Sequence, residues 1–398
     1  MDDLKVLMIP TTNAGVAFWR MFNFWVGAFR TRAMDVHMPF WKWDMPEANP
    51  WETMIAEPQY KSMITNELTT KVRQADVVVM QLAHFPDSLM TFAGIKEMFP
   101  GTPVVAEVDD NYISTASYNP AFQAYEPGRP LRDIANKQFQ IADALIVSTP
   151  YLKDVYAELN DNIHVVPNCI DLKRWDVKAR NKPGIRIGWA GGASHYEDLK
   201  LLEPIIHATL KKHKGVKFVF LHGIPEFLKN IPDVECVYRF ERIDKYPRYL
   251  AANDFDIGLA PLIDNAFNRG KSNLRWLEYS ALGIPTVASN VGHFKETINH
   301  GVDGFLADSK EDFQNYLDHL ITNRKERIAV GLRAKERIAS DFNVDKWAFH
   351  YADILKEIVK KGQVKKDVDM ILYGKQNKDF KEAVEAGHAI GESAEVLQ

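Results

Sequence analysis

The sequence predicts an α/β protein with two doubly wound domains that face a central cleft. Short apolar runs rich in β-branched residues alternate with longer amphipathic stretches, which is typical of parallel sheets covered by helices on both faces. The alternation pauses once, over the polar and basic residues 171–184, which we interpret as a linker closed by a Pro-Gly turn. A chain of 398 residues has room for two or three domains.

The first half of the chain supplies one sheet and its helices. Five apolar runs are expected to be strands, at 4–9, 77–82, 103–108, 144–149 and 163–167. Helical patterns occupy 58–74 and 130–142 between them. These elements define an N-terminal Rossmann-like domain over residues 1–182.

The second half repeats the same alternation. Strands are expected at 185–190, 216–222, 255–262 and 285–289, and helices at 196–213, 272–282, 310–321 and 324–340. They define a C-terminal Rossmann-like domain over 183–342. Residues 343–361 form an amphipathic helix with an apolar stripe that includes Trp347, Tyr351 and Leu355. A charged extension, 362–398, follows, in which 377–386 can be helical.

Composition excludes several classes of protein. The chain holds 49 Lys and Arg against 53 Asp and Glu, and this balance argues against a broad surface for nucleic acid. Two cysteines, Cys169 and Cys236, are too few for a disulfide framework or a cysteine-rich zinc site. The first residues are acidic where a signal peptide is basic, and no run of 18 apolar residues occurs. We therefore expect a cytoplasmic protein.

The segment 255–308 carries the strongest chemical signal. An apolar strand ends near Leu262, a polar loop follows, and a helix is expected to begin at about Lys271. The unpaired N–H groups of a helix start form an anion site, and a lysine there adds a point charge suited to phosphate. Two turns later, Glu278 can accept two hydrogen bonds from a vicinal diol such as ribose. The alternative is an ordinary capped helix with a solvated lysine and glutamate.

This segment also carries a family resemblance. LEYSALGIPTVAS, followed by HGVDGFLAD, resembles the donor-site signature of the retaining glycosyltransferases with the GT-B fold, the large group similar to glycosyltransferase family 4. Residues 190–206 look like the first strand, loop and helix of the donor domain of that family. Residues 142–156 and 164–175 look like the last part of its acceptor domain. The resemblance implies the GT-B fold, a nucleotide-sugar co-substrate, and a final helix at 343–361 that packs back on the first domain.

The resemblance assigns donor-binding roles to several residues. Glu278 corresponds to the glutamate that binds the nucleotide ribose. The remaining donor-side residues fall on the loops that approach the diphosphate, and they are Gly15, Gly191, Gly192, Lys271, Ser272 and Asn273. A glycine suits such loops because the backbone can approach a ligand closely where no Cβ intervenes.

The sequence departs from the family pattern at three positions. The family usually has a second glutamate at the position of Gly270, and it often has an arginine and a lysine at the positions of Gly192 and Glu197. Another set of cations must then neutralise the diphosphate. Lys271 and Arg269 are the leading candidates, with Arg275 and Arg20 behind them. His195, on the donor loop, either caps that loop or touches phosphate, and an ordinary surface histidine is the alternative.

The acceptor side of the predicted cleft is acidic and aromatic. The strand 103–108 delivers Asp109 and Asp110 to its carboxyl end, where they are candidate catalytic residues for sugar hydroxyls or the acceptor proton. In the family a histidine often stands near Asp109, and the alternative for the pair is the cap of a turn. The candidate acceptor-binding residues are Arg20, Trp41, Trp43 and His84, because aromatic faces stack on sugars and cations suit a phosphate-bearing acceptor.

These observations predict a glycosyltransferase that moves a sugar from a UDP- or GDP-sugar to an acceptor hydroxyl with retention. No divalent metal and no other cofactor are expected to be required. The acceptor stays open among a glycan, a lipid-linked glycan, a protein, a small molecule and a hydroxylated base of DNA. Two further alternatives are a catalytically silent protein that binds nucleotide sugars and an epimerase of the same fold.

Overall fold

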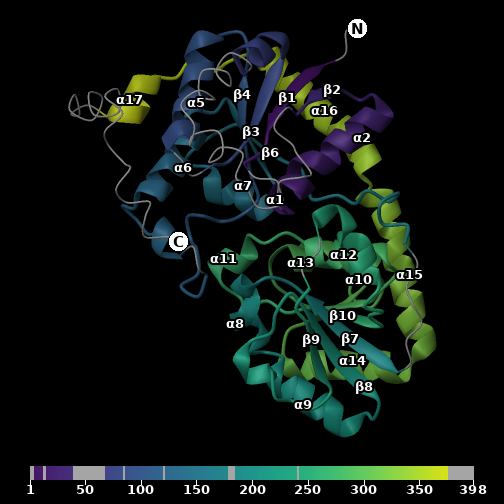
Figure 1. Cartoon of the computed structure of the whole chain (residues 1–398). Coiled ribbons are helices and arrows are strands. Elements are labelled where there is room, and N and C mark those ends of the chain that lie inside the picture. The colour runs from purple at the N-terminus through teal and green to yellow at the C-terminus, as the bar shows by residue number, and fades with distance from the viewer. Residues whose placement is uncertain are drawn as a thin grey trace.

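The structure is a computed structural model that describes residues 4–11, 15–38, 68–83, 86–119, 122–177, 184–239 and 242–374. Two α/β domains lie one above the other in Figure 1, and helices near the end of the chain run along one side of both. The expected helix at 58–74 is described only from residue 68, and 68–74 is helical. The possible helix at 377–386 lies outside the described residues.

The first domain is built on a parallel sheet. In the described part of the chain its strand order is β2-β1-β3-β4-β5-β6. The strands are β1 (Lys5–Ile9), β2 (Asp35–His37), β3 (Val77–Gln81), β4 (Val104–Val108), β5 (Ala144–Val147) and β6 (Ile163–Val165). Every residue of β3, β4 and β5 is buried, as strands covered on both faces require. The five expected strands are present, and the short, half-exposed β2 is additional.

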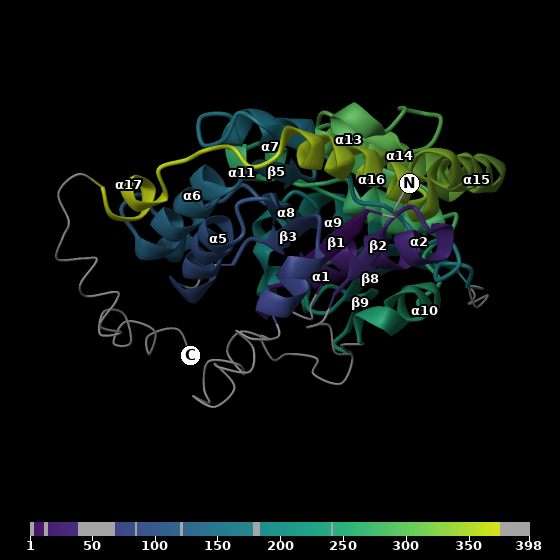
Figure 2. The same cartoon turned by 90° about the horizontal axis from the view of Figure 1, so that it is seen from above.

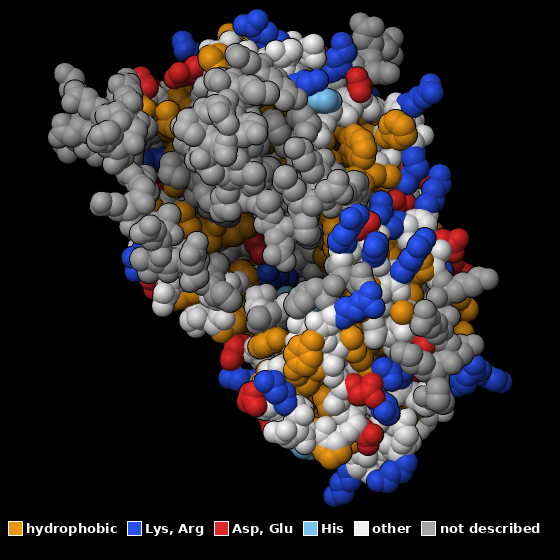
Figure 3. Space-filling model, in the orientation of Figure 1, with side chains coloured by type: hydrophobic (Ala, Val, Ile, Leu, Met, Phe, Trp, Pro, Cys, Tyr) orange, Lys and Arg blue, Asp and Glu red, His pale blue; other side chains and the backbone are white. Residues whose placement is uncertain are grey.

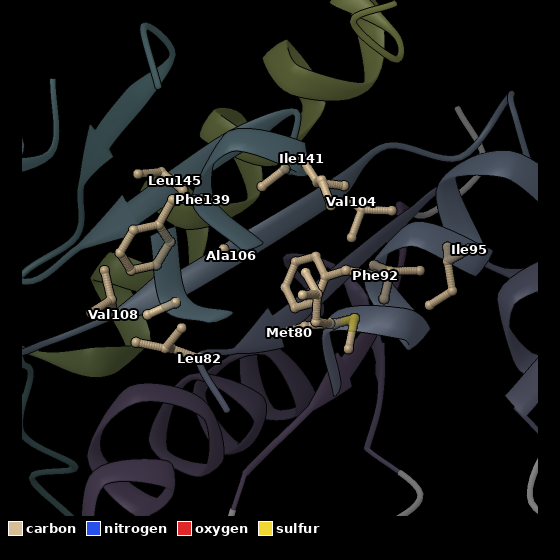
Figure 4. Packing of buried hydrophobic residues seen from close by; sticks show 14 of the residues in the cluster. Met80, Leu82, Phe92, Ile95, Val104, Ala106, Val108, Phe139, Ile141 and Leu145 are labelled. Carbon is tan, nitrogen blue, oxygen red and sulfur yellow. The ribbon is translucent and has the colours of Figure 1, made fainter. Parts of the chain in front are cut away.

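Helices cover both faces of this sheet. They are α1 (Gly15–Ala17), α2 (Asn23–Thr31), α5 (Pro86–Met98), α6 (Pro130–Ile141) and α7 (Pro150–Tyr156), and a π-helical turn at Phe18–Phe22 joins α1 to α2. Figure 4 shows Phe92 of α5 and Phe139 of α6 packed over side chains of β3 and β4, with Met80 and Val104 among them. Burial of this apolar surface holds α5 and α6 on the sheet.

The second domain has a parallel sheet with the order β12-β11-β10-β7-β8-β9. Its strands are β7 (Ile185–Ala190), β8 (Val216–Leu221), β9 (Val234–Val237), β10 (Ile257–Ala260), β11 (Thr286–Ser289) and β12 (Phe305–Ala307). The first strand lies in the middle, and the chain continues to one side with β8 and to the other with β10. In such sheets ligands bind beyond the carboxyl ends of the strands at this switch point.

The helices of the second domain differ from expectation in two ways: one expected helix is divided, and the helices at 246–251, 266–269 and 292–297 were not expected. They are α8 (Tyr196–Leu199), α9 (Glu203–Lys212), α10 (Tyr246–Ala251), α11 (Ala266–Arg269), α12 (Leu274–Ala281), α13 (Gly292–Thr297), α14 (Lys310–Thr322) and α15 (Arg324–Asp341). The single helix expected at 196–213 is divided into α8 and α9. Pro204 stands in the first turn of α9, and a proline has no N–H to continue a preceding helix.

Helix α16 (Val344–Lys361) crosses from the second domain to the first and packs on α2. The two helices meet closely, because a Cβ at Gly27 would lie 2.9 Å from the carbonyl oxygen of Val344. After Gly362, the backbone N–H of Val364 donates to Asp143, and α17 (Val368–Tyr373) buries Val368 and Leu372 against the first core. Figure 2 shows α17 beside α6 at the far end of the first domain.

One apolar core runs from the first domain into the second. The start of the expected linker is not solvated, because Trp175 is only 2% exposed. Its ring lies 6.2 Å from that of Trp19 in the first domain and 6.2 Å from that of Tyr246 in the second. Phe18 and Phe22 belong to the same cluster, together with Trp276 and Phe294 of the second domain. This cluster joins the domains behind the cleft.

No helix in the described ranges combines the length and the apolar character that crossing a bilayer demands.

We predict that Trp175→Ala lowers the free energy of unfolding by about 3–5 kcal/mol, because it removes a large buried ring from the core that both domains share. Urea denaturation, monitored by circular dichroism, measures this decrease in the free energy of unfolding. Phe29→Ala is the control, since that ring is 77% exposed, and its effect is expected to stay within about 0.5 kcal/mol. Equal effects of the two substitutions would contradict a shared core at Trp175.

Candidate active site

A cleft of about 430 Å³ lies between the domains, where the carboxyl ends of both sheets meet. Figure 3 shows the hollow between the two lobes. The first domain contributes Gly15, Trp19, Asp109, Asp110 and Asn168 to its wall. The second domain contributes, among others, Gly191, Gly192, His195, His222, Tyr246, Lys271, Ser272, Arg275, Glu278 and Phe294.

The structure therefore brings most of the predicted site residues to one cavity. Ten of them line it: Gly15, Asp109, Asp110, Gly191, Gly192, His195, Lys271, Ser272, Arg275 and Glu278. Arg20, Arg269 and Asn273 are described but do not line it. Trp41, Trp43 and His84 lie outside the described residues.

Arg20 is buried behind the cleft wall rather than exposed to an acceptor. Its Nε lies 2.5 Å from Oε1 of Glu107, and the two side chains are 1% and 0% exposed. A buried carboxylate needs such a partner, because an unpaired charge in the interior is very costly. Nη1 of Arg20 also donates to Oδ1 of Asn168 at 3.1 Å. The acceptor role expected for Arg20 is therefore replaced by a structural role.

Arg269 and Asn273 also differ from expectation. Arg269 forms a two-pronged ion pair with Asp264, at 2.6 and 3.0 Å, and its side chain is 51% exposed. Asn273 is fully buried, and its Nδ2 lies 3.4 Å from Oγ1 of Thr297. The backbone of Asn273 forms the N-cap of α12, so it contributes to the helix start and not to the cleft wall.

Lys271 lies at the loop before α12 and reaches across the cleft. Its Nζ is 2.7 Å from Oδ1 of Asp110 in the other domain, and it lies 4.3 Å above the ring of Phe267. Beside it, Oγ of Ser272 accepts a hydrogen bond from Nδ2 of Asn168 at 2.8 Å. The cation expected to meet a phosphate is thus partly neutralised by a carboxylate of the opposite domain.

The two aspartates at the end of β4 are held in place by their backbone. The carbonyl oxygen of Asp110 accepts from Tyr156, and that of Asp109 accepts from Ser148. Burial raises the pKa of Asp109 to about 7, with further contributions from Asp110 and Glu107, while Arg20 and Lys271 act in the opposite direction. Near neutral pH, Asp109 can therefore both accept and release a proton.

Glu278 is a buried carboxyl group on the cleft wall. It is 6% exposed, and burial raises its pKa to about 7 although Arg275 opposes the shift. The hydroxyl of Tyr246 donates to Oε2 at 3.3 Å. A carboxyl group that pays this desolvation cost and still faces a cavity is typical of functional sites.

Three cleft residues were missed or ranked low from the sequence. Arg275 follows the start of α12, stacks 5.4 Å over the ring of Trp189, and approaches Gly191 so closely that a Cβ there would lie 2.9 Å from its Nη2. His222 adopts a left-handed backbone, φ 69°, directly after β8. Tyr246 belongs to no recognisable sequence motif. His222 could have been predicted as a cleft residue because it follows the carboxyl end of a strand, and Arg275 because it lies in the first turn of the helix after Lys271.

Among the residues that the structure describes, no three His, Cys, Asp or Glu side chains cluster closely enough to hold a metal ion.

Two doubly wound domains whose sheets present their carboxyl ends to one cleft define the GT-B fold, and this chain has that fold, as the sequence predicted. Residues 203–353 match the model of the family described as glycosyl transferase-like. The resemblance to GT-B glycosyltransferases predicted from the donor-site signature is thereby confirmed.

Individual proteins are also similar to this chain. A GDP-mannose-dependent alpha-(1-6)-phosphatidylinositol monomannoside mannosyltransferase of Mycobacterium tuberculosis is 29% identical over 83 residues, which are 20% of this chain and 22% of that protein. The match thus spans about a fifth of that relative. Anabaena HepE, solved with UDP and glucose, superposes with a TM-score of 0.60 at 14% identity, over 89% of this chain and 100% of that one. Sucrose-phosphate synthase of Thermosynechococcus elongatus gives 0.63 at 12% identity, over 90% and 100%. These two structures establish the fold.

We predict that Glu278→Gln stabilises the protein at alkaline pH. The pKa of Glu278 is about 7 in the folded protein, and its ordinary value is 4.5. Preferential protonation of the folded state therefore stabilises the protein fully below pH 4.5, and this stabilisation is lost as pH rises through 7. Glutamine does not titrate. The unfolding free energy of the variant relative to the wild type should therefore rise by about 2–3 kcal/mol between about pH 5 and about pH 8.

Urea denaturation at several pH values measures this difference. Glu235→Gln is the control with the opposite sign, because Lys217 and Arg186 lower the pKa of Glu235 despite partial burial. A difference between Glu278→Gln and the wild type that does not change with pH would show that Glu278 is ionised throughout.

Proposed function

We propose that this protein is a glycosyltransferase that moves a sugar from a nucleoside-diphosphate sugar to an acceptor hydroxyl. One observation carries the proposal: a single cleft unites Lys271, the start of α12 and Glu278 from one domain with Asp109 and Asp110 from the other. Cations and helix N–H groups suit a diphosphate, and the carboxylates opposite suit hydroxyl groups.

The second domain holds the donor in this proposal. Ionised Glu278 accepts hydrogen bonds from the ribose diol, while Lys271 and Arg275 meet the diphosphate beside the start of α12. HepE, solved with UDP-glucose, and the GDP-mannose-dependent mycobacterial enzyme point to a UDP- or GDP-sugar as the donor.

The reaction replaces one bond at the anomeric carbon by another. The bond from that carbon to the β-phosphate oxygen breaks, its electron pair goes to the phosphate, and the acceptor oxygen forms the new bond. Lys271 and the N–H groups at the start of α12 stabilise the charge that develops on the leaving diphosphate. Ionised Asp109 takes the proton of the acceptor hydroxyl. We propose that attack occurs on the face that the diphosphate leaves, so that configuration is retained without a protein nucleophile or a metal ion.

The decisive experiment incubates the purified protein with UDP-glucose, UDP-N-acetylglucosamine or GDP-mannose and candidate acceptors. Glycans, lipid-linked glycans, small molecules and DNA with hydroxylated bases are compared, and products are identified by mass spectrometry. A glycosylated acceptor with release of the nucleoside diphosphate supports the proposal. An isomerised nucleotide sugar would instead indicate an epimerase, and binding without any product would indicate a catalytically silent protein.

We predict that Lys271→Ala lowers kcat at least tenfold, which corresponds to about 1.4 kcal/mol of barrier, because the leaving phosphate loses one of the cations proposed to stabilise it. Steady-state kinetics of diphosphate release measure the effect. Arg269→Ala is the matched comparison, since Arg269 ends α11 two residues before Lys271 but pairs with Asp264 and does not line the cleft, and the variant should keep wild-type turnover. Unchanged turnover in Lys271→Ala would move the phosphate role to another residue.

We predict that Glu278→Gln weakens binding of the nucleotide sugar about tenfold or more, because an amide oxygen replaces a charged group that accepts two hydrogen bonds. Isothermal titration calorimetry with the donor identified above gives the affinity. The same variant is expected to be at least as stable as the wild type at alkaline pH, which separates a binding role from a folding role. Equal donor affinity in variant and wild type would exclude Glu278 from the ribose site.

A further inference from the structure

Asp198 is a fully buried carboxylate directly behind the cleft wall. It is 0% exposed and lies in the short helix α8, after the glycine turn that follows β7. It accepts three hydrogen bonds, from Nδ1 of His195 at 2.9 Å, from the backbone N–H of Ile263 at 2.9 Å, and from Nδ2 of Asn268 at 2.7 Å. Three donors compensate the burial of its charge.

These bonds connect the loops that build the donor side of the cleft. His195 follows β7, Ile263 follows β10, and Asn268 lies in α11 just before Lys271. Nδ2 of Asn268 is also 3.1 Å from the hydroxyl of Tyr118 in the first domain. Asp198 therefore fixes the position of His195 relative to the loop that carries Lys271.

The same contact determines which nitrogen of His195 carries the proton. An ionised carboxylate only accepts hydrogen bonds, so Nδ1 must be the protonated nitrogen. Burial lowers the pKa of His195, and Lys271 and Arg275 add to this effect against the opposing influence of Asp198. The ring is thus neutral near pH 7, and Nε2 keeps a lone pair.

A lone pair on Nε2 restricts what His195 can bind. The side chain lines the cleft and is 18% exposed, and the nitrogen left for a ligand is a hydrogen-bond acceptor. A phosphate oxygen is also an acceptor, so the two repel each other, whereas a hydroxyl group donates to Nε2. Lys271 and Arg275, on the same wall, already supply cations for a diphosphate.

We propose that His195 recognises a hydroxyl group of the donor sugar through Nε2, and that Asp198 is the positioning residue that fixes its ring and tautomer. The inference rests on the proposed function and deepens it, because it assigns a residue to the sugar where Gly270 replaces the glutamate expected from the family pattern. It also replaces the expectation that His195 touches phosphate.

The first experiment compares sugar nucleotides with the matching diphosphates. Affinities of wild type and His195→Ala for UDP, UDP-glucose, GDP and GDP-mannose are measured by calorimetry. His195→Ala should weaken binding of the preferred sugar nucleotide at least tenfold and that of its diphosphate less than twofold. Equal losses for both would place His195 on the phosphate and overturn the proposal.

His213→Ala is the matched control. His213 forms a comparable pair with Asp318, at 2.7 Å, but does not line the cleft, and its replacement should leave all four affinities unchanged. If the wild type binds none of the four ligands, the proposed function fails and this inference fails with it. If the wild type binds them but His195→Ala shows no selective loss of affinity for the sugar nucleotide, the inference about His195 fails and the proposed function is unaffected.

The second experiment observes the tautomer directly. In protein labelled with ¹⁵N-histidine, the ring of His195 should show a protonated Nδ1 and an unprotonated Nε2 near neutral pH, with His195→Ala used to assign the signals. In Asp198→Asn the amide can donate to Nδ1, so the proton should move to Nε2, and the preference for the sugar nucleotide over its diphosphate should fall towards that of His195→Ala. A wild-type ring protonated on Nε2 would contradict the proposal, as would an unchanged tautomer in an Asp198→Asn variant that folds normally.

Discussion

The arrangement of the two domains depends on the apolar core around Trp175, which both domains share. Parallel sheets present their chemistry at the carboxyl ends of their strands, so two such sheets form one site only if those ends face each other. Trp175 joins the domains beside the cleft, because its ring packs against Trp19 of the first domain and edge-on against Tyr246 of the second. Helix α16 then ties the end of the second domain to α2 of the first. The two domains therefore share a hydrophobic interior as well as a surface.

Polar contacts extend this junction into the cleft itself. Glu107 pairs with Arg20, Arg20 donates to Asn168, and Asn168 donates to Ser272 in the loop before α12. This chain of hydrogen bonds leads from the centre of one sheet to the other domain. A buried ion pair contributes little net stability, so its clearest effect here is to fix the geometry of Asn168. The position of the loop before α12 is thus linked to Arg20 and Glu107, which do not line the cleft.

Much of the fold could be predicted from the sequence because long apolar runs are sufficient to identify strands buried on both faces. Strands β2 and β9 were missed because they are short and not buried, so they leave no apolar run. Strand β12 is apolar and mostly buried, but it is only three residues long. The predicted site rested on a motif, and Lys271 and Glu278 do line the cleft. The position of Arg20 could not be predicted, since its partner Glu107 is distant in sequence and is brought near only by the packing of the π-helical turn on the sheet. The raised pKa of Glu278 likewise arises from burial by the folded chain.

The ion pair between Lys271 and Asp110 affects both the binding and the release of a diphosphate at Lys271 under the proposed function. In the proposed reaction, the leaving diphosphate binds Lys271 only after it displaces the carboxylate of Asp110, whose Oδ1 lies 2.7 Å from Nζ of Lys271. The loss of this ion pair offsets part of the attraction between the lysine and the diphosphate. Under the proposed function, Asp110 can pair with Lys271 again after the sugar has been transferred, which favours release of the nucleoside diphosphate. This competition lowers the affinity of Lys271 for a diphosphate, and it depends on the contact between the domains, because Asp110 and Lys271 belong to different domains.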